Sequence, residues 1–300
     1  MYGVGLALAV VIGVSLGFFG GGGSILTVPL LVYVFALPAK QAIASSLLVV
    51  AAASASGAIQ HWRLGNVRLP TAALFGSAGI AGAYVGGRAA AFVDGALLLL
   101  LFAMMMLLTA AAMWRGRRAA TATATGGRAS LRLAVQGAAV GLFTGLVGAG
   151  GGFLIVPALA LWAGLPMPAA VGTSLVVIVA NALAGYAGYA AHVSIDLRLV
   201  ATIAVTAIAG SFAGARLAQR VDPASLRKAF AGFVLAMAAF VLVRETPTWI
   251  DAARTALPRS GGQLAFVLLV LAAGVAAGRA SRGGAAEPFA ETPYEQGAGI

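Results

Sequence analysis

The sequence predicts an all-α polytopic membrane protein built from two inverted repeats, each a glycine-broken helical hairpin followed by three transmembrane helices, with one extra C-terminal helix. Hydrophobic residues make up 61% of the 300 residues and charged residues 9%, and the mean hydropathy is +0.99. This composition leaves too little polar surface for a soluble globule. A run of glycines interrupts an apolar stretch twice, and the spacing of the apolar stretches in the first half returns in the second.

The apolar stretches form two sets with the same order and spacing. We expect helices at 4–19, 25–37, 41–60, 70–87 and 96–113, then at 132–147, 153–165, 169–190, 199–215 and 226–243, with a further one at 263–279. The chain accordingly divides into a first transmembrane repeat at 1–114, a linker at 115–131, a second transmembrane repeat at 132–243, an interfacial loop at 244–262, an extra transmembrane helix at 263–280 and a disordered tail at 281–300.

An internal duplication relates the two sets. Adding 128 to a residue number in the first half gives its counterpart in the second half, without a gap. Distinctive residues stay in register under this offset: Gly13 and Gly141, Gly20 and Gly148, Pro29 and Pro157, Pro38 and Pro166, Ser46 and Ser174, Arg88 and Arg216, Asp94 and Asp222. A shared membrane composition alone would not keep these residue types aligned over most of a repeat.

Each repeat contains a glycine-rich break, written GFFGGGGSILTVPL at 17–30 and GLVGAGGGFLIVPA at 145–158. Glycine destabilises a helix interior, and irregular backbone inside a bilayer is tolerated only where protein covers it or where it lines a polar cavity. A helix that resumes after the break points free N–H groups and its positive dipole end into that cavity, which favours an anion. The backbone candidates for substrate binding are Gly21, Gly22, Gly23, Ser24, Ala149, Gly150, Gly151 and Gly152.

Polar side chains near the start of the next helix are further candidates for substrate binding: Ser45, Ser46, Thr173 and Ser174. Their hydroxyls either face the substrate or bond the backbone of their own helix, and both interpretations stay open. Asn181 is the most informative side chain of the second half, because an amide in mid-membrane is costly without a partner. Its counterpart is Ala53, so the predicted site is asymmetric.

A third group consists of candidates for the transport pathway: Gln60, His61, Tyr186, Arg88 and Arg216. The first three lie near the far ends of the site helices, where they either line an entrance or form a polar cap at the interface. The two arginines flank the turns between helices. They serve either as antechamber cations for an anion or as topology and capping residues.

The basic residues predict the orientation of the chain. If the hairpin at 1–38 leaves and returns on one side, the halves are inverted, and most of the 19 Lys and Arg residues fall on one side of the membrane. The positive-inside rule then places the linker at 115–131 in the cytoplasm of a multi-pass protein of the bacterial inner membrane. The net charge of +11 reflects this topology rather than nucleic-acid binding. Whether the hairpins are re-entrant or fully spanning stays open.

Several of these motifs occur together in both halves: the glycine break, the V-P after it, the L-P before the next helix, and the S-S-L or T-S-L within that helix. The combination resembles the sulfite exporter TauE/SafE family, also called the toluene sulfonate uptake permease family, over roughly residues 3–243. The resemblance implies a membrane carrier, expected to export, for sulfur-containing anions such as sulfite, sulfoacetate or other organosulfonates. The residues themselves indicate only a geometry suited to anions.

The residue inventory limits the chemistry. There are no cysteines, and all acidic residues are expected in loops, helix ends or the tail: Asp94, Asp196, Asp222, Glu245, Asp251, Glu287, Glu291 and Glu295. We therefore expect no embedded carboxylate to relay protons, no cofactor, no metal site, no catalytic residue and no enzymatic activity. The expected partners are a small anion and the lipid bilayer. The coupling ion and any homo-oligomer stay open, and a carrier or flippase for a phosphate-bearing lipid or another organic anion is the alternative function.

Overall fold

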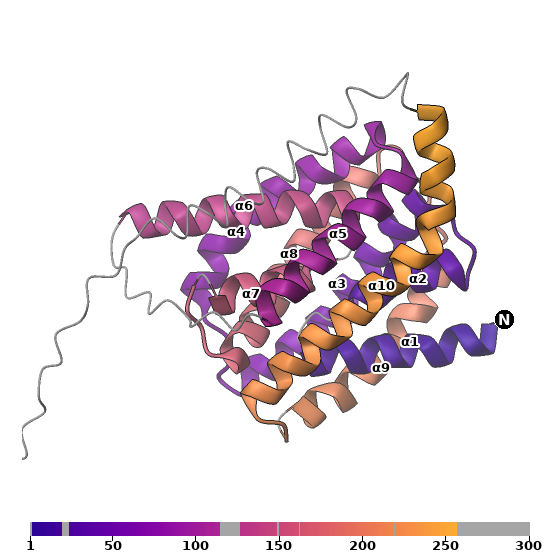
Figure 1. Cartoon of the computed structure of the whole chain (residues 1–300). Helices are drawn as coiled ribbons and strands as arrows, with labels where there is room; N and C mark the ends of the chain where they lie inside the picture. The colour runs from indigo at the N-terminus through magenta and orange to yellow at the C-terminus, as the bar shows by residue number, and fades with distance from the viewer. Residues whose placement is uncertain are drawn as a thin grey trace, which may run out of the picture.

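The computed structural model describes residues 2–19, 24–114, 127–148, 150–161, 163–218 and 220–256. Over these ranges the protein is helical, which confirms the predicted all-α class (Figure 1). The first half contains α1 (Tyr2–Phe19), α2 (Ser24–Tyr33), α3 (Ala39–Arg63), α4 (Leu69–Ala89), the 3₁₀ helix η1 (Ala90–Phe92) and α5 (Gly95–Trp114). The second half contains α6 (Gly127–Val147), α7 (Gly152–Leu161), α8 (Met167–Tyr189), α9 (Leu197–Ala218) and α10 (Pro223–Ala256).

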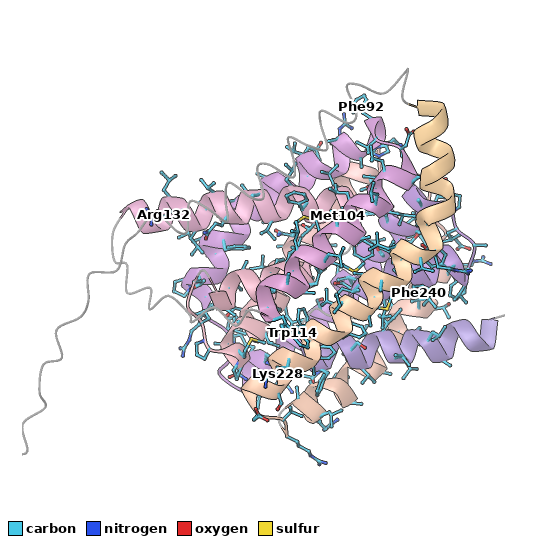
Figure 2. The ribbon with its side chains drawn as sticks, viewed as in Figure 1. Phe92, Met104, Trp114, Arg132, Lys228 and Phe240 are labelled. Atoms are coloured by element: carbon cyan, nitrogen blue, oxygen red, sulfur yellow. The ribbon has the colours of Figure 1, made fainter. Side chains whose placement is uncertain are left out.

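Four helical segments of the described residues are long and apolar enough to cross a membrane: α3, α4 together with η1, α8 and α9. Large apolar side chains also cover the outside, among them Phe92, Met104, Trp114 and Phe240 (Figure 2). A surface of this composition is suited to lipid rather than to water.

Helices α3 and α8, which are equivalent in the two repeats, pack against each other in opposite directions. A Cβ atom on Gly57 would lie 3.2 Å from Leu175 Cδ1, and one on Gly185 would lie 3.4 Å from Leu47 Cδ1. These two contacts are related by the offset of 128. Pro38 and Pro166 cap the starts of the two helices, where a missing backbone N–H costs nothing.

The same relation holds for the helices around this centre, since α1 packs on α9 and α6 packs on α4. Small residues allow the backbones to touch, as is common between membrane helices. A Cβ on Gly13 would lie 2.0 Å from the carbonyl oxygen of Ala207, and one on Gly141 would lie 2.1 Å from that of Gly79. The second contact repeats the first with both residues shifted by the offset, so the sequence duplication is also a duplication of contacts.

Helices α5 and α10 pack on each other and complete the core. Phe102 of α5 meets the ring of Phe153 in α7 at 5.8 Å, and its counterpart Phe230 of α10 meets Phe19 of α1 at 5.5 Å, both edge to face. These buried rings hold the residues next to both glycine breaks, Phe19 before the first and Phe153 after the second.

Two expectations for the C-terminal part need correction. Residues 244–256, expected to be an interfacial loop, continue helix α10 to Ala256. Glu245, expected at a helix end, is buried within α10 and accepts a hydrogen bond of 2.7 Å from the Tyr33 hydroxyl of α2. The Arg244 guanidinium lies 5.4 Å from the centre of the same tyrosine ring. The Tyr33–Glu245 hydrogen bond and the contact of Arg244 with the Tyr33 ring stabilise α10 beyond residue 243, where we expected the helix to end. Residues 127–131, expected at the end of the linker, instead form the start of α6. The rest of the linker at 115–126, the rest of the expected loop at 257–262, the extra helix at 263–280 and the tail at 281–300 lie outside the described residues.

Candidate functional site

The second glycine break is imposed by backbone conformation and by packing. Gly148, Gly150 and Gly151 have φ angles of +70°, +58° and +72°, a region that side-chain-bearing residues occupy only at a cost. A Cβ on Gly148 would lie 2.1 Å from Ile43 Cγ2, and one on Gly151 would lie 2.0 Å from Thr144 Cγ2. The positive φ angles take the chain out of the helical conformation, and helix starts again at Gly152. Neither Gly148 nor Gly151 has room for a side chain, so glycine is required at both positions. The corresponding residues Gly20–Gly23, and Ala149, lie outside the described residues.

Hydrogen bonds fix this break to the helices around it. The Ser46 hydroxyl of α3 contacts the carbonyl oxygens of Gly148 and, at 2.7 Å, of Ile43. The Tyr189 hydroxyl of α8 donates to the Leu146 carbonyl at 2.6 Å. Both side chains satisfy carbonyls that the end of α6 leaves without helical partners. Ser46, expected to contact the substrate, therefore supports the break in this structure.

The other predicted hydroxyls are also buried. Ser174 donates to the Val171 carbonyl of its own helix at 2.7 Å, the pattern named above as the alternative to substrate binding. Thr173 accepts a 2.9 Å hydrogen bond from the Arg68 N–H at the start of α4. Ser24 begins α2, and Ser45 lies beside Ser46 in α3. Direct contact of these residues with a substrate stays a prediction.

Asn181 differs from these residues because its amide has no hydrogen-bond partner in the described part of the chain. The side chain is fully buried in α8, and neither its Nδ2 nor its Oδ1 atom is paired within the described part of the chain. A Cβ on Gly79 of α4 would lie 2.7 Å from both atoms, so the amide lies directly against the backbone of α4. An unpaired buried amide costs about 1–3 kcal/mol. This cost is understandable if the amide binds a polar ligand during the transport cycle.

Asn181 also lies close to the second break. A Cβ on Gly150 would lie 3.5 Å from Cγ2 of Ile178, which precedes Asn181 by one helical turn. Gly79, which faces the amide, packs on Gly141 of α6, the helix that leads into the break. The break before α7 and the Asn181 amide of α8 are thus linked through the contacts of Ile178, Gly79 and Gly141.

The pathway candidates are spread over both ends of the molecule. His61 is buried near the end of α3, and neither of its ring nitrogens has a partner among the described residues. Gln60 makes a long 3.4 Å contact with the Ser56 carbonyl, and Tyr186 is partly buried. Arg88 and Arg216 are exposed in the last turns of α4 and α9. The structure does not bring these five residues into one cluster.

Sequence reasoning missed Gly79 and Thr144 near the candidate site, and it missed the burial of Ser54. Gly79 resembles the other glycines of the chain, and its role depends on the amide that faces it. Thr144 donates to the Gly141 carbonyl at 2.8 Å and packs on the break. Ser54 is a second fully buried polar side chain without a partner in the described residues. An isolated serine in a membrane helix gives no signal that would distinguish it.

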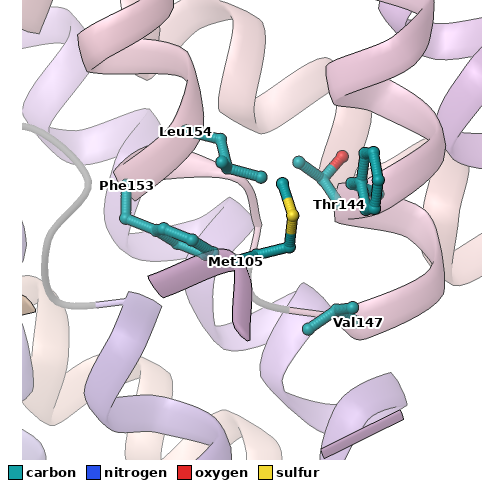
Figure 3. Close-up of a pocket in the computed structure, with 6 residues that line it drawn as sticks. Met105, Thr144, Val147, Phe153 and Leu154 are labelled. Atoms are coloured by element: carbon teal, nitrogen blue, oxygen red, sulfur yellow. The ribbon is translucent and has the colours of Figure 1, made fainter. Parts of the chain in front are cut away.

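A pocket next to the first turn of α7 shows how tightly this region is closed. It is lined by Met105, Phe143, Thr144, Val147, Phe153 and Leu154 (Figure 3). Apart from the threonine hydroxyl the lining is apolar, and the pocket has no room for a water molecule. This pocket therefore offers no path for a polar solute to the start of α7. Within the described residues, no group of three His, Asp or Glu side chains could hold a metal ion.

The contact between Gly79 and Asn181 gives a testable prediction. We expect Gly79→Ala to reduce transport at least tenfold, because the new Cβ would lie 2.7 Å from both amide atoms and must displace the side chain. Gly76→Ala on the same helix is the matched control, since its Cβ would lie at an ordinary 3.6 Å from Val177 Cγ2. Flux measurements on both variants check this, and equal fluxes would contradict a role for the Asn181 position.

Apolar helices long enough to cross a membrane, an apolar exterior and a glycine-broken hairpin define a polytopic membrane protein of the transporter class. The sequence model of the family described as "Sulfite exporter TauE/SafE" matches residues 5–241, with a second match at 192–290. The chain belongs to this family of membrane transporters, as its motifs indicated.

Relatives found by sequence comparison carry the same general name. A "Probable membrane transporter protein" of Xylella fastidiosa strain 9a5c is 35% identical over 240 residues, which cover 78% of this chain and 92% of that protein. The protein YdhB of Bacillus subtilis, named in the same way, is 28% identical over 73% of this chain and 91% of its own. One from Methanocaldococcus jannaschii is 27% identical over 79% and 96%. No solved structure matches the chain.

Proposed function

We propose that the protein exports sulfur-containing small anions, such as sulfite, sulfoacetate or other organosulfonates, by alternating access around a central site at the glycine breaks. The observation that carries the proposal is the buried Asn181 amide, which has no hydrogen-bond partner among the described residues. It lies one helical turn from Ile178, whose side chain is next to the Gly150 position of the break before α7. The amide offers two N–H donors, and the helix start adds backbone N–H donors and a positive partial charge. A compact oxyanion accepts hydrogen bonds on several sides, as this arrangement requires.

The family description is the reason for proposing a sulfur-containing substrate. The geometry adds the hydrogen-bond donors that an oxyanion needs. The site needs no positively charged side chain, because the backbone N–H groups at a helix N-terminus bind anions without one. For a monovalent anion, an inside-negative potential favours export by about 2.3 kcal/mol per 100 mV. The proposed export therefore needs no embedded carboxylate as a proton relay. The Glu245 carboxylate in α10 is hydrogen-bonded to Tyr33, away from the break residues.

The proposal includes inverted repeats in the bacterial inner membrane, with the linker at 115–131 in the cytoplasm. Support comes from α3 and α8, which are equivalent in sequence and run in opposite directions. The Thr173 hydroxyl near the start of α8 binds the loop after α3. If both helices cross the bilayer, the repeats that contain them have opposite orientations, as in other carriers with a midplane site.

A ligand panel tests the proposal and its alternative. Thermal unfolding of the purified protein is measured with sulfite, an alkyl sulfonate, inorganic phosphate and a polyprenyl phosphate at equal ionic strength. We expect sulfite or the sulfonate to stabilise the protein by about 2.7 kcal/mol at a hundred times its Kd, with no such effect in Asn181→Leu. Stabilisation by the polyprenyl phosphate alone would overturn the proposal in favour of a lipid-phosphate carrier.

A further inference from the structure

Three basic side chains from separate elements gather at the end of the molecule where α3 begins and where α4 and α8 end. Lys40 lies in the first turn of α3, Arg88 in the last turn of α4, and His192 in the loop after α8. The Lys40 ammonium donates a 3.0 Å hydrogen bond to the Ala91 carbonyl in η1, three residues after Arg88. The start of α3 is thereby joined to the end of α4.

Glycine contacts join the end of α4 to the end of α8. A Cβ on Gly188 would lie 2.9 Å from the backbone nitrogen of Arg88, and one on Gly87 would lie 2.3 Å from the Gly185 carbonyl oxygen. The backbones of the two last turns therefore touch. His192 lies three residues after Tyr189, the last residue of α8. Its backbone N–H donates to the Tyr189 carbonyl at 2.9 Å, and the centres of the two rings are 5.3 Å apart.

The three groups also interact electrostatically. Partial burial, and then the charges of Lys40 and Arg88, lower the pKa of His192 below its ordinary value. These two cations are the charged groups that act on the imidazole, and Tyr189 is the titratable side chain packed against it. Within the described residues no carboxylate forms an ion pair with Lys40, Arg88 or His192. The acidic residues closest to the cluster along the chain are Asp94, which precedes Gly95 beside Ala39, and Asp196, whose Oδ1 accepts the backbone N–H groups of Arg198 and Leu199. Positive charges that no carboxylate pairs are what an incoming anion would neutralise.

The repeat relation shows that this gathering is specific to one end. The counterpart of Arg88 is Arg216, but the counterpart of Lys40 is Pro168 and that of His192 is Leu64. A cluster required only to cap helices or to set topology would be expected at both of the equivalent ends. Its presence at one end points to a function that differs between the two faces of the protein.

We propose that Lys40, Arg88 and His192 form an anion-binding site at this face, which holds the oxyanion of the transported substrate as it enters or leaves, and that His192 takes up a proton when the anion binds. The site rests on the proposed function for its substrate class. In the proposed topology it lies on the face opposite the linker, so it receives the anion after the central site. Because the bound anion stabilises the protonated imidazole, the affinity for the anion rises as the pH falls through the range in which His192 titrates.

The test uses the fact that the chain contains only two histidines. The full-length protein, labelled at histidine and placed in lipid nanodiscs, is titrated by NMR with and without an alkyl sulfonate, which stays ionised throughout the pH range. His192→Gln assigns the signal. We expect the sulfonate to raise the pKa of His192. The protein with a protonated His192 should then bind the sulfonate about tenfold more tightly than the protein with a neutral His192 for each unit of that rise.

Matched variants separate the site from general electrostatics. Arg88→Gln and Lys40→Met are expected to remove the effect of the sulfonate on the His192 titration, whereas Arg216→Gln, the repeat equivalent, is expected to preserve it. A His192 titration that the sulfonate leaves unchanged in the wild-type protein would overturn the inference. The result does not depend on transport, so an absence of sulfonate flux would count against the proposed function alone.

Discussion

Asn181→Leu is expected to leave the protein folded and at least as stable as the wild type, and to lose most of its transport of the anion. Leucine has nearly the shape of asparagine, and its substitution removes a buried amide that has no partner and costs about 1–3 kcal/mol. Hydrogen bonds to charged groups are worth about 1.5–3 kcal/mol. Their loss lowers anion affinity by roughly ten- to a hundredfold, so stability and transport should change in opposite directions.

Thermal unfolding and flux on the same preparation check this prediction. Ser54→Ala is the control, because it removes the other fully buried polar side chain of the described residues that lacks a partner, and we expect it to keep the flux. If Asn181→Leu transports normally, the amide has no role in the site. If it unfolds instead, the amide is structural, and its partner is a group of the folded protein.

Gly151→Ala is expected to cause a large loss of stability. The substituted residue keeps a φ of +72°, which costs about 1–2 kcal/mol for an L-amino acid, and its Cβ would lie 2.0 Å from Thr144 Cγ2. Overpacking adds about 1–3 kcal/mol. Because α7 starts at the next residue, the change also displaces the amides that we propose to hold the anion.

Two other glycines separate these contributions. Gly65 has a φ of +73° but no atom within 4 Å of a new Cβ, so Gly65→Ala carries only the conformational cost. Gly232 is helical with open space around it, so Gly232→Ala is expected to be neutral or stabilising by up to about 1 kcal/mol. Unfolding temperatures that fall in the order Gly232→Ala, Gly65→Ala, Gly151→Ala would agree with this account. A Gly151→Ala protein as stable as Gly65→Ala would contradict it.

The helices were largely predictable because their lengths and ends have local causes. Apolar stretches bounded by glycine, proline or charge reappear as α1 to α9 within a few residues. The exception is α10, which continues past its predicted end. The Tyr33–Glu245 hydrogen bond in that region joins residues 212 positions apart, and no local pattern in either segment announces it.

The candidate site was predictable in its backbone but not in its hydrogen bonds. Consecutive glycines predict a break, and the structure places three of them at positive φ. Which hydroxyl supports the second break, however, depends on how α3 packs on it, and no local pattern around Ser46 predicts its contact with the Gly148 carbonyl. Glycines have two structural roles here, at different positions: Gly13 and Gly141 let helices touch, whereas Gly148 and Gly151 form the break.

The most direct test of the central claim is the flux of labelled sulfite and of a labelled organosulfonate through the purified protein in proteoliposomes, with membrane potential, pH gradient and sodium gradient imposed one at a time. We predict saturable flux of at least one of these anions, driven by the membrane potential and mostly lost in Asn181→Leu. No flux of either anion under any of the gradients, from protein shown to be folded by its thermal unfolding transition, would contradict the account.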